Sequence, residues 1–183
     1  MKTKLVKNAL GREVPVEVNG EQVAPFKGVG KHRPQGRQHA PKITTSLDYP
    51  SDGNKIVDSL KVALKEADIS DKMTISTHHH LRNGDFIANQ VFAIASEFGV
   101  KDLTWLPSAS FPCHEPIIEQ LKDGTIDHIE GSMNGPLGKF TSEGNMKGIG
   151  VLRSHGGRYQ AIQDGEVTID IAVIAAPTAD KFG

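Results

Sequence analysis

Hydrophobic periodicity divides the chain from residue 51 onward into alternating strands and helices. Apolar runs or period-two alternation predict strands, and Ile87, Val91, Ile94 and Phe98 fall on one helical stripe. The strands are expected at 72–77, 103–106, 125–130, 149–152 and 169–175, and the helices at 52–68, 87–98, 116–124, 136–143 and 159–164. This alternation predicts an α/β fold, a mostly parallel sheet with helices on both faces.

The remaining segments suggest a division into two regions. Residues 51–183 would form the α/β domain, and residues 1–50 an irregular basic arm and loop. Within the arm, Val14, Val16 and Val18 alternate before Asn19-Gly20, which predicts a short strand and a tight turn, whereas the polar start of the chain is expected to be irregular. The run at 169–175 is the most apolar and suits the middle of a sheet. Because the chain stops soon after it, a truncation is expected.

The amino-acid composition narrows both the class of protein and its expected cellular compartment. Hydrophobic residues make up 37% of the 183 residues and aromatic residues only 5%, with 19 glycines, which favours a small-residue α/β enzyme over an aromatic platform for nucleic acid. The single cysteine, Cys113, cannot form an internal disulfide, which favours a reducing, cytoplasmic location. The sequence has no run of 18 apolar residues and no apolar signal-peptide core, so no contact with a membrane is expected.

Charge is distributed unevenly along the chain. The net charge is −1, but residues 1–42 hold nine Lys or Arg and only three Glu. A basic arm suits a phosphate-bearing cofactor, an acidic partner or the acidic body of the same chain, and the glycine- and proline-rich stretch 27–41 also suits a solvated linker. Nucleic acid is disfavoured because no nucleic-acid-binding fold signature accompanies the charge.

The most unusual stretch is Thr77–Asp85, which reads T-H-H-H-L-R-N-G-D. It lies between a predicted strand and a predicted helix, so it is a β-to-α loop at the carboxyl end of the sheet, where α/β proteins bind ligands. Gly84 permits a tight turn, and the amides at the helix start suit an anion or a polarised carbonyl oxygen. Arg82 is suited to a carboxylate, with a surface salt bridge as the alternative.

Metal binding and nucleophilic catalysis are weaker interpretations. Three consecutive histidines alternate in direction along an extended chain and do not converge on one ion, so no metal is expected. At least one histidine is expected to be structural and another to bind a carboxylate or thioester. Cys113 and His114 are adjacent and lack an evident third partner, which disfavours a nucleophile. The sequence has no phosphate loop of the kinase type, and Gly28-Val29-Gly30 lacks the strand and helix of a dinucleotide site.

Taken together, several stretches resemble the alpha subunit of bacterial citrate lyase. The matching stretches are G-V-G-K-H-R-P-Q-G-R-Q-H-A-P (28–41), H-H-H-L-R-N-G-D (78–85), K-D-L-T (101–104), S-F-P-C-H (110–114), G-P-L-G (135–138), H-G-G-R (155–158) and I-A-A-P-T-A-D (174–180). The resemblance implies a CoA-transferase-like α/β fold, related to sugar-phosphate isomerases. It implies that citrate displaces acetate from the acetyl thioester of an acyl carrier subunit, giving citryl-carrier and acetate. A lyase subunit then forms oxaloacetate and acetyl-carrier.

The resemblance also implies roles for particular residues. Amides around Asn83 and Gly84 would stabilise the oxyanion formed when a carboxylate attacks a thioester. A CoA-type thioester, acetyl-CoA or the phosphoribosyl dephospho-CoA group of the carrier, would meet the basic arm at Lys31, Arg33 and Arg37. Citrate would contact residues of the histidine loop and of the loops after later strands: His78, His79, His80, Arg82, Ser110, Gly135, His155 and Gly156.

Length is the main departure from this family. Its members carry a second CoA-transferase-like half, which holds the essential glutamate in related enzymes and is absent here. The chain is therefore expected to be inactive alone. Two alternatives remain: a CoA transferase for another small carboxylate, and a non-catalytic fragment that serves in assembly or carrier docking. The expected partners are the gamma (carrier) and beta (lyase) subunits, and an exposed sheet edge favours self-association.

Overall fold

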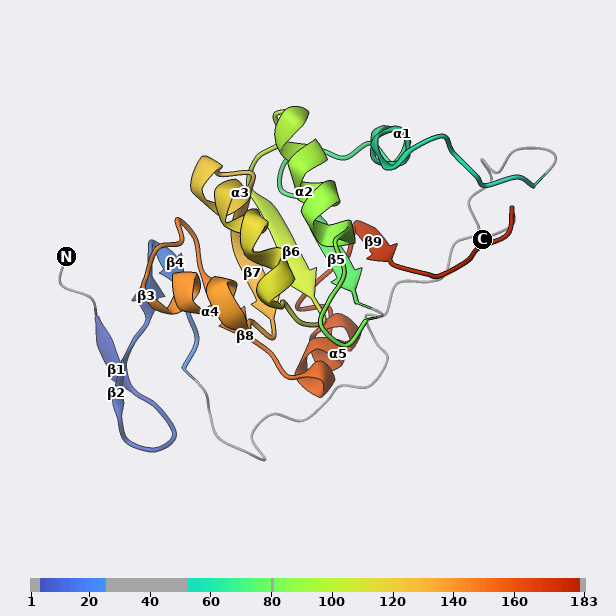
Figure 1. Ribbon diagram of the computed structural model, residues 1–183. Helices are drawn as coiled ribbons and strands as arrows, with labels where there is room; N and C mark the ends of the chain where they lie inside the picture. The colour runs from blue at the N-terminus through green and yellow to red at the C-terminus, as the bar shows by residue number, and fades with distance from the viewer. Residues whose placement is uncertain (1–3, 26–52, 80, 182–183) are drawn as a thin grey trace.

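A five-stranded parallel sheet forms the centre of the chain (Figure 1). The computed structural model describes residues 4–25, 53–79 and 81–181. The strands are arranged in the order β8-β7-β6-β5-β9, and every neighbouring pair is parallel. Their bounds are β5 (Thr74–His78), β6 (Leu103–Pro107), β7 (Ile126–Gly131), β8 (Gly150–Leu152) and β9 (Ile171–Ile174). The α/β class expected from the sequence is confirmed.

Helices cover both faces of this sheet, as predicted. They are α1 (Leu60–Glu66), α2 (Ile87–Glu97), α3 (Ile118–Asp123), α4 (Gly135–Ser142) and α5 (His155–Gln163), with a 3-10 helix at Pro112–Ile117. From β5 to β8 the chain always steps in one direction, so right-handed crossovers bring α2, α3 and α4 to one face. The return from β8 to β9 runs the other way and brings α5 to the opposite face.

The buried apolar side chains form two clusters, which match this division of the helices between the two faces. The larger cluster joins Leu64 of α1, Phe92 of α2, Leu121 of α3 and Leu137 of α4 to the strands. At its centre Trp105 is fully buried, its ring meets Phe92 edge-on at 5.4 Å, and its Nε1 donates to Thr77 Oγ1 at 2.9 Å. The smaller cluster pairs Leu106 of β6 with Ala161 of α5 and with Val167.

Local capping explains where the first helix and the fifth helix begin. Ser59 caps α1 by accepting a hydrogen bond from the Val62 amide at 3.2 Å, so the predicted start near residue 52 is wrong for the described residues 53–58; Asp52 lies outside them. Ser154 caps α5 in the same way through the Gly157 amide at 3.0 Å. That helix therefore begins four residues before the predicted start at Tyr159, because a serine N-cap outweighs two glycines in the first turn.

The last strand lies at an edge of the sheet among the described residues, so the prediction of a central position is wrong. Ile171 and Val173 pack against the larger cluster, whereas Ala172 and Ile174 are exposed. An unbroken apolar run is typical of a strand covered on both faces, but here only one face is covered within the described residues.

The N-terminal region contains two small antiparallel hairpins. β1 (Leu5–Lys7) pairs with β2 (Glu13–Pro15), and β3 (Glu17–Val18) pairs with β4 (Glu21–Gln22). The expectation of an irregular start is therefore wrong for the first hairpin, while the turn at Asn19-Gly20 is confirmed, with φ of +50° and +86°. The Asn19 side chain ties this region to the α/β body by donating to the carbonyls of Met146 and Gly148 at 3.2 and 2.8 Å. The predicted boundary at residue 50 lies outside the described residues.

Candidate active site at the carboxyl edge of the sheet

The histidine loop, residues 77–85, begins with the last two residues of β5, the strand at which the strand order reverses. From β5 the chain builds outward through β6, β7 and β8, and it returns to place β9 on the other side of β5. Crevices outside the carboxyl ends of strands at such reversals are the usual ligand sites of open α/β sheets. The predicted β-to-α position of this loop is confirmed.

Two of the three histidines stack at the end of β5. His78 is its last residue and is exposed, and its ring centroid lies 5.6 Å from that of His79. The His79 ring meets Phe111 edge-on at 4.5 Å, and its Nδ1 lies 2.8 Å from the Leu81 carbonyl oxygen. Since a carbonyl oxygen only accepts, Nδ1 carries a proton and donates to it, so in the uncharged tautomer the acceptor is Nε2. His80 lies outside the described residues.

The second half of the loop combines exposed polar residues with a tightly packed glycine. Arg82 and Asn83 are exposed, and Arg82 forms no ion pair with the described residues. Gly84 has φ of +87°, and a Cβ there would lie 2.7 Å from Cys113 Sγ. The Gly84 amide donates to the Leu81 carbonyl at 3.0 Å. In this conformation that amide is occupied, and the oxyanion role assigned to Asn83 and Gly84 stays a prediction.

His114 is hydrogen-bonded to the backbone of the histidine loop. The Phe111 amide donates to its Nδ1 at 3.0 Å, so Nε2 carries the proton and donates to the Asp85 carbonyl at 2.8 Å. Its side chain is only 3% exposed, and this burial lowers its pKa below 6.5, which keeps the ring neutral at pH 7. Both ring nitrogens are engaged with the backbone, so His114 positions the loop.

Cys113 supports the same loop as a thiol. Its Sγ lies 3.3 Å from the Asn83 carbonyl oxygen, to which the S–H donates. Burial, with the negative charge of Asp85, raises the pKa of Cys113 above 9.0, so the sulfur stays protonated at neutral pH. The geometry therefore agrees with disfavouring a Cys113 nucleophile.

Hydrogen bonds join the loop after β6 to the loop after β7. Ser110 is fully buried, and its Oγ accepts from the Asn134 amide at 3.0 Å. The Asn134 side-chain amide donates back to the Ser110 carbonyl at 3.1 Å. Gly135 has φ of +63°, and a Cβ there would lie 3.2 Å from Pro112 Cγ. The loops after β5, β6 and β7 thus form one connected unit, while the substrate roles of Ser110 and Gly135 stay predictions.

The remaining predicted residues lie in α5 or outside the described residues. His155 and Gly156 are exposed in the first turn of α5, after β8. β8 lies three strand positions from β5, a separation of roughly 14 Å at the usual strand spacing. His155 and Gly156 share the carboxyl edge of the sheet with the histidine loop, and their substrate roles stay predictions. Lys31, Arg33 and Arg37 lie outside the described residues.

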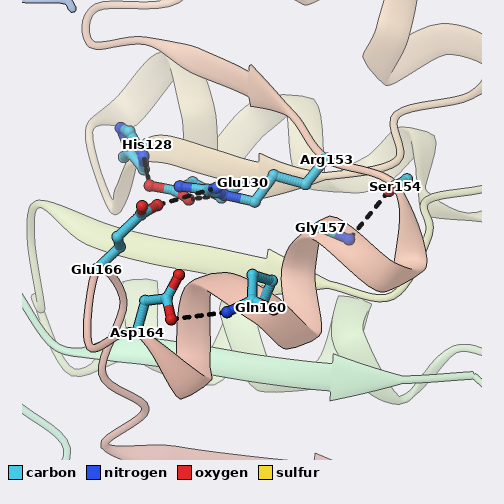
Figure 2. A network of polar contacts seen from close by, with 8 residues as sticks. All are labelled: His128, Glu130, Arg153, Ser154, Gly157, Gln160, Asp164 and Glu166. Atoms are coloured by element: carbon cyan, nitrogen blue, oxygen red, sulfur yellow. Dashed lines mark hydrogen bonds and ion pairs between the residues drawn. The ribbon is translucent and has the colours of Figure 1, made fainter. Parts of the chain in front are cut away.

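A polar network joins the segments on either side of α5 to the sheet (Figure 2). Glu130 of β7 accepts hydrogen bonds from His128 Nε2 at 2.9 Å and from Arg153 Nε at 2.6 Å. Arg153 Nη1 also reaches Glu166 at 3.3 Å. The network joins β7, the end of β8 and the segment after α5, so it sets where α5 lies on the sheet.

Sequence reasoning missed Arg158 and the positioning roles of His114 and Asn134. Arg158 extends from α5 to β5 and β6, where its Nη2 donates to Ser76 Oγ at 2.5 Å and approaches the Leu106 carbonyl at 3.4 Å. Its place in the H-G-G-R stretch could have pointed to it. The sequence predicted a loop there, however, so a position of Arg158 within a helix was not expected. His114 and Asn134 act through backbone contacts, which no residue pattern shows.

The family profile of citrate lyase, alpha subunit (CitF), matches residues 53–183. The chain belongs to the citrate lyase alpha subunit family. It is 43% identical over 130 residues to the citrate lyase alpha chain of Klebsiella pneumoniae and 35% identical over 147 residues to that of Escherichia coli K12. These matches cover 70% and 80% of this chain.

A crystal structure from Streptococcus mutans, described as an alpha subunit of citrate lyase in complex with citrate, has the same fold. It superposes with a TM-score of 0.74 at 34% identity and covers 96% of this chain. The chain spans 26% and 29% of the length of the two curated relatives and 34% of the Streptococcus chain. It therefore corresponds to a part of a citrate lyase alpha subunit.

Proposed function

We propose that this chain is the citrate-binding part of an acyl transferase that exchanges acetate for citrate on a thioester of an acyl carrier subunit. A citrate carboxylate oxygen attacks the thioester carbonyl of acetyl-carrier to give a mixed anhydride and the carrier thiolate. The thiolate then attacks the citryl carbonyl, which gives citryl-carrier and releases acetate. The gamma subunit supplies the carrier, the beta subunit cleaves citryl-carrier, and the complex works in the cytoplasm.

One observation carries this proposal: in a chain of this family, the histidine loop occupies the carboxyl edge at the reversal of strand order. The citrate in the Streptococcus relative supports a carboxylate ligand for the fold. Arg82, exposed and without an ion pair among the described residues, is suited to a citrate carboxylate through two parallel hydrogen bonds.

The other residues of the edge have proposed roles that follow from their contacts. His79 offers Nε2 as an acceptor to the citrate hydroxyl, since its Nδ1 proton is held by Leu81. The Gly84 amide reaches an oxyanion only if it leaves the Leu81 carbonyl, so substrate binding would open that turn. Lys31, Arg33 and Arg37 are proposed to hold the phosphates of the CoA-type thioester.

A second candidate follows from the length of the chain. Because it spans less than a third of the curated relatives, it is also suited to a non-catalytic role in assembly or carrier docking. A transferase that uses a small carboxylate other than citrate is a third candidate.

Transfer of acetyl from acetyl-CoA to citrate tests these candidates. The chain is assayed alone and with the C-terminal remainder of a full-length relative, with acetate and succinate as competing acceptors. We expect citrate-dependent transfer only in the complemented pair. Activity in the chain alone would place all catalytic groups within these residues. Inactivity in a reassembled, folded pair would favour the docking role, and a preference for succinate would favour another transferase.

A further inference from the structure

Arg158 carries a half-buried charge that is incompletely satisfied. Its Nη2 is used by Ser76 and Leu106, and its Nε is buried without a hydrogen-bond partner. Among the described residues no carboxylate pairs with this guanidinium, and only burial acts on its pKa, which it lowers. Arginine stays charged even so, and a desolvated cation without a counter-charge is costly.

A nearby arginine, Arg153, is fully paired with carboxylates, in contrast to Arg158. Arg153 is bound by Glu130 and Glu166 at 2.6 and 3.3 Å (Figure 2). Arg158 is five residues further along and receives neither carboxylate. An unpaired buried donor in a native structure calls for a physical explanation, and a ligand that supplies the missing acceptor is one.

A second unpartnered group lies at the same end of the sheet. Ser108 is 4% exposed, and its Oγ is buried without a hydrogen-bond partner. Its amide donates to the Thr77 carbonyl at 2.9 Å, and the next residue, Ala109, bridges to Ser132, so the chain stays extended past β6. Side chains alternate along an extended chain, so Ser108 shares the face of Leu106, which packs against α5.

The same alternation places His78 on this face. Arg158 is bonded to Ser76 of β5, and His78 is two residues further along that strand, roughly 7 Å away. The α5 face of the carboxyl edge therefore collects a guanidinium, two serine hydroxyls and an imidazole beside the histidine loop. Each of these groups can donate a hydrogen bond, and the guanidinium of Arg158 adds a permanent positive charge.

We propose that Arg158, with Ser76 and Ser108, forms a second carboxylate-binding position on the α5 face, which holds one carboxylate of a small polycarboxylic acid while Arg82 holds another. This inference rests on the proposed function, because it assigns a contact of the same citrate site. A planar carboxylate matches a single guanidinium flanked by hydroxyls. Two separate carboxylate positions would favour citrate over the monocarboxylate acetate, which fills only one.

Nuclear magnetic resonance of the arginine side chains tests the proposal. Citrate is titrated into the ¹⁵N-labelled chain, alone and with the C-terminal remainder of a relative, while the Nε–Hε signal of Arg158 is followed. That signal is assigned by its absence from Arg158→Lys. We expect a saturable shift with citrate and with tricarballylate, and none with the uncharged trimethyl ester of citrate.

Matched variants give a second readout. Loss of a hydrogen bond to a charged group reduces affinity by about tenfold or more, which we expect for citrate with Arg158→Gln. We expect a smaller loss with Ser108→Ala, which removes one neutral donor. Arg12→Gln, on the exposed turn after β1, serves as the control and should bind citrate unchanged.

Three results would overturn the proposal. If backbone signals of the histidine loop shift and that of Arg158 does not, citrate binds without this position and the proposed function stands. If no signal responds to citrate in either preparation, the position is absent, and the acetyl-transfer assay judges the proposed function separately. If the Arg158 signal shifts when the C-terminal remainder is added without citrate and then ignores citrate, a protein carboxylate fills the position.

Discussion

At the scale of single residues, the candidate site depends on contacts that keep the histidine loop in one conformation. Gly84 turns the loop at positive φ directly against Cys113 and Phe111, and His114 binds the Asp85 carbonyl. The tight turn at Gly84 was predictable from residue type and position, whereas the role of Arg82 stays a prediction. The contacts of His114 and Arg158 were not predictable, because each residue meets a partner distant in sequence.

Replacing Gly84 with alanine should destabilise the chain and distort the loop. The new Cβ would meet Cys113 Sγ at 2.7 Å and Phe111 Cδ2 at 3.0 Å, in addition to the strain of φ at +87°. We expect a loss of about 3 kcal/mol in the free energy of unfolding, measured with urea.

Gly99→Ala is the matched control for this substitution. Gly99 has φ of +75° but no heavy atom within 4 Å of the added Cβ, so only backbone strain applies. We expect it to cost about 1 kcal/mol. Equal losses in the two variants would show that the contacts with Cys113 and Phe111 contribute nothing.

At the scale of elements, periodicity predicts the long segments better than the short ones. α2 and all five strands of the sheet occur where the pattern places them, because burial of one face enforces the period. The starts of α1 and α5 were misplaced, since a serine cap rather than an apolar stripe defines each. The edge position of β9 depends on topology, which a local pattern does not encode.

Acid should weaken the network that joins β7, β8 and α5. Burial alone would raise the pKa of Glu130, but the hydrogen bonds from His128 and Arg153 outweigh it and hold this pKa below 4.5. A depressed carboxyl pKa contributes stability that is present above pH 4.5 and is lost as the pH falls through the folded-state value. We expect Glu130→Gln to cost about 2 kcal/mol at pH 7 and progressively less as the pH falls below 4.5.

Urea unfolding of both proteins across this pH range measures the difference. Glu119→Gln, which changes an exposed glutamate of α3, is the control and should alter stability by less than about 0.5 kcal/mol. A deficit of Glu130→Gln that does not change with pH would show that Glu130 is not stabilised as a carboxylate.

At the scale of the whole molecule, the chain presents a sheet edge that the described residues leave uncovered. β9 pairs only with β5 among them, and Ile174 is 64% exposed. The chain spans 26% of the length of its Klebsiella relative. Within the described residues no helix is long and apolar enough to cross a membrane, and no group of three or more His, Cys, Asp or Glu is placed to hold a metal.

Alone, the chain should self-associate through this edge. Unpaired strand edges with exposed apolar side chains favour pairing with a second copy. We expect sedimentation velocity to show a concentration-dependent dimer that Ile174→Lys weakens, while Leu10→Lys, on the first hairpin, leaves it unchanged. A monomer at all concentrations would refute the expectation.

The central claim is that the histidine loop after β5 holds a citrate carboxylate, and the Michaelis constant for citrate tests it most directly. The constant is measured in the complemented pair for the unchanged chain, for Arg82→Ala and for the control Arg12→Ala. Loss of a charge-assisted contact predicts that Arg82→Ala raises the constant by about tenfold or more, with Arg12→Ala unchanged. An unchanged constant in Arg82→Ala would remove this arginine from the site and contradict the account.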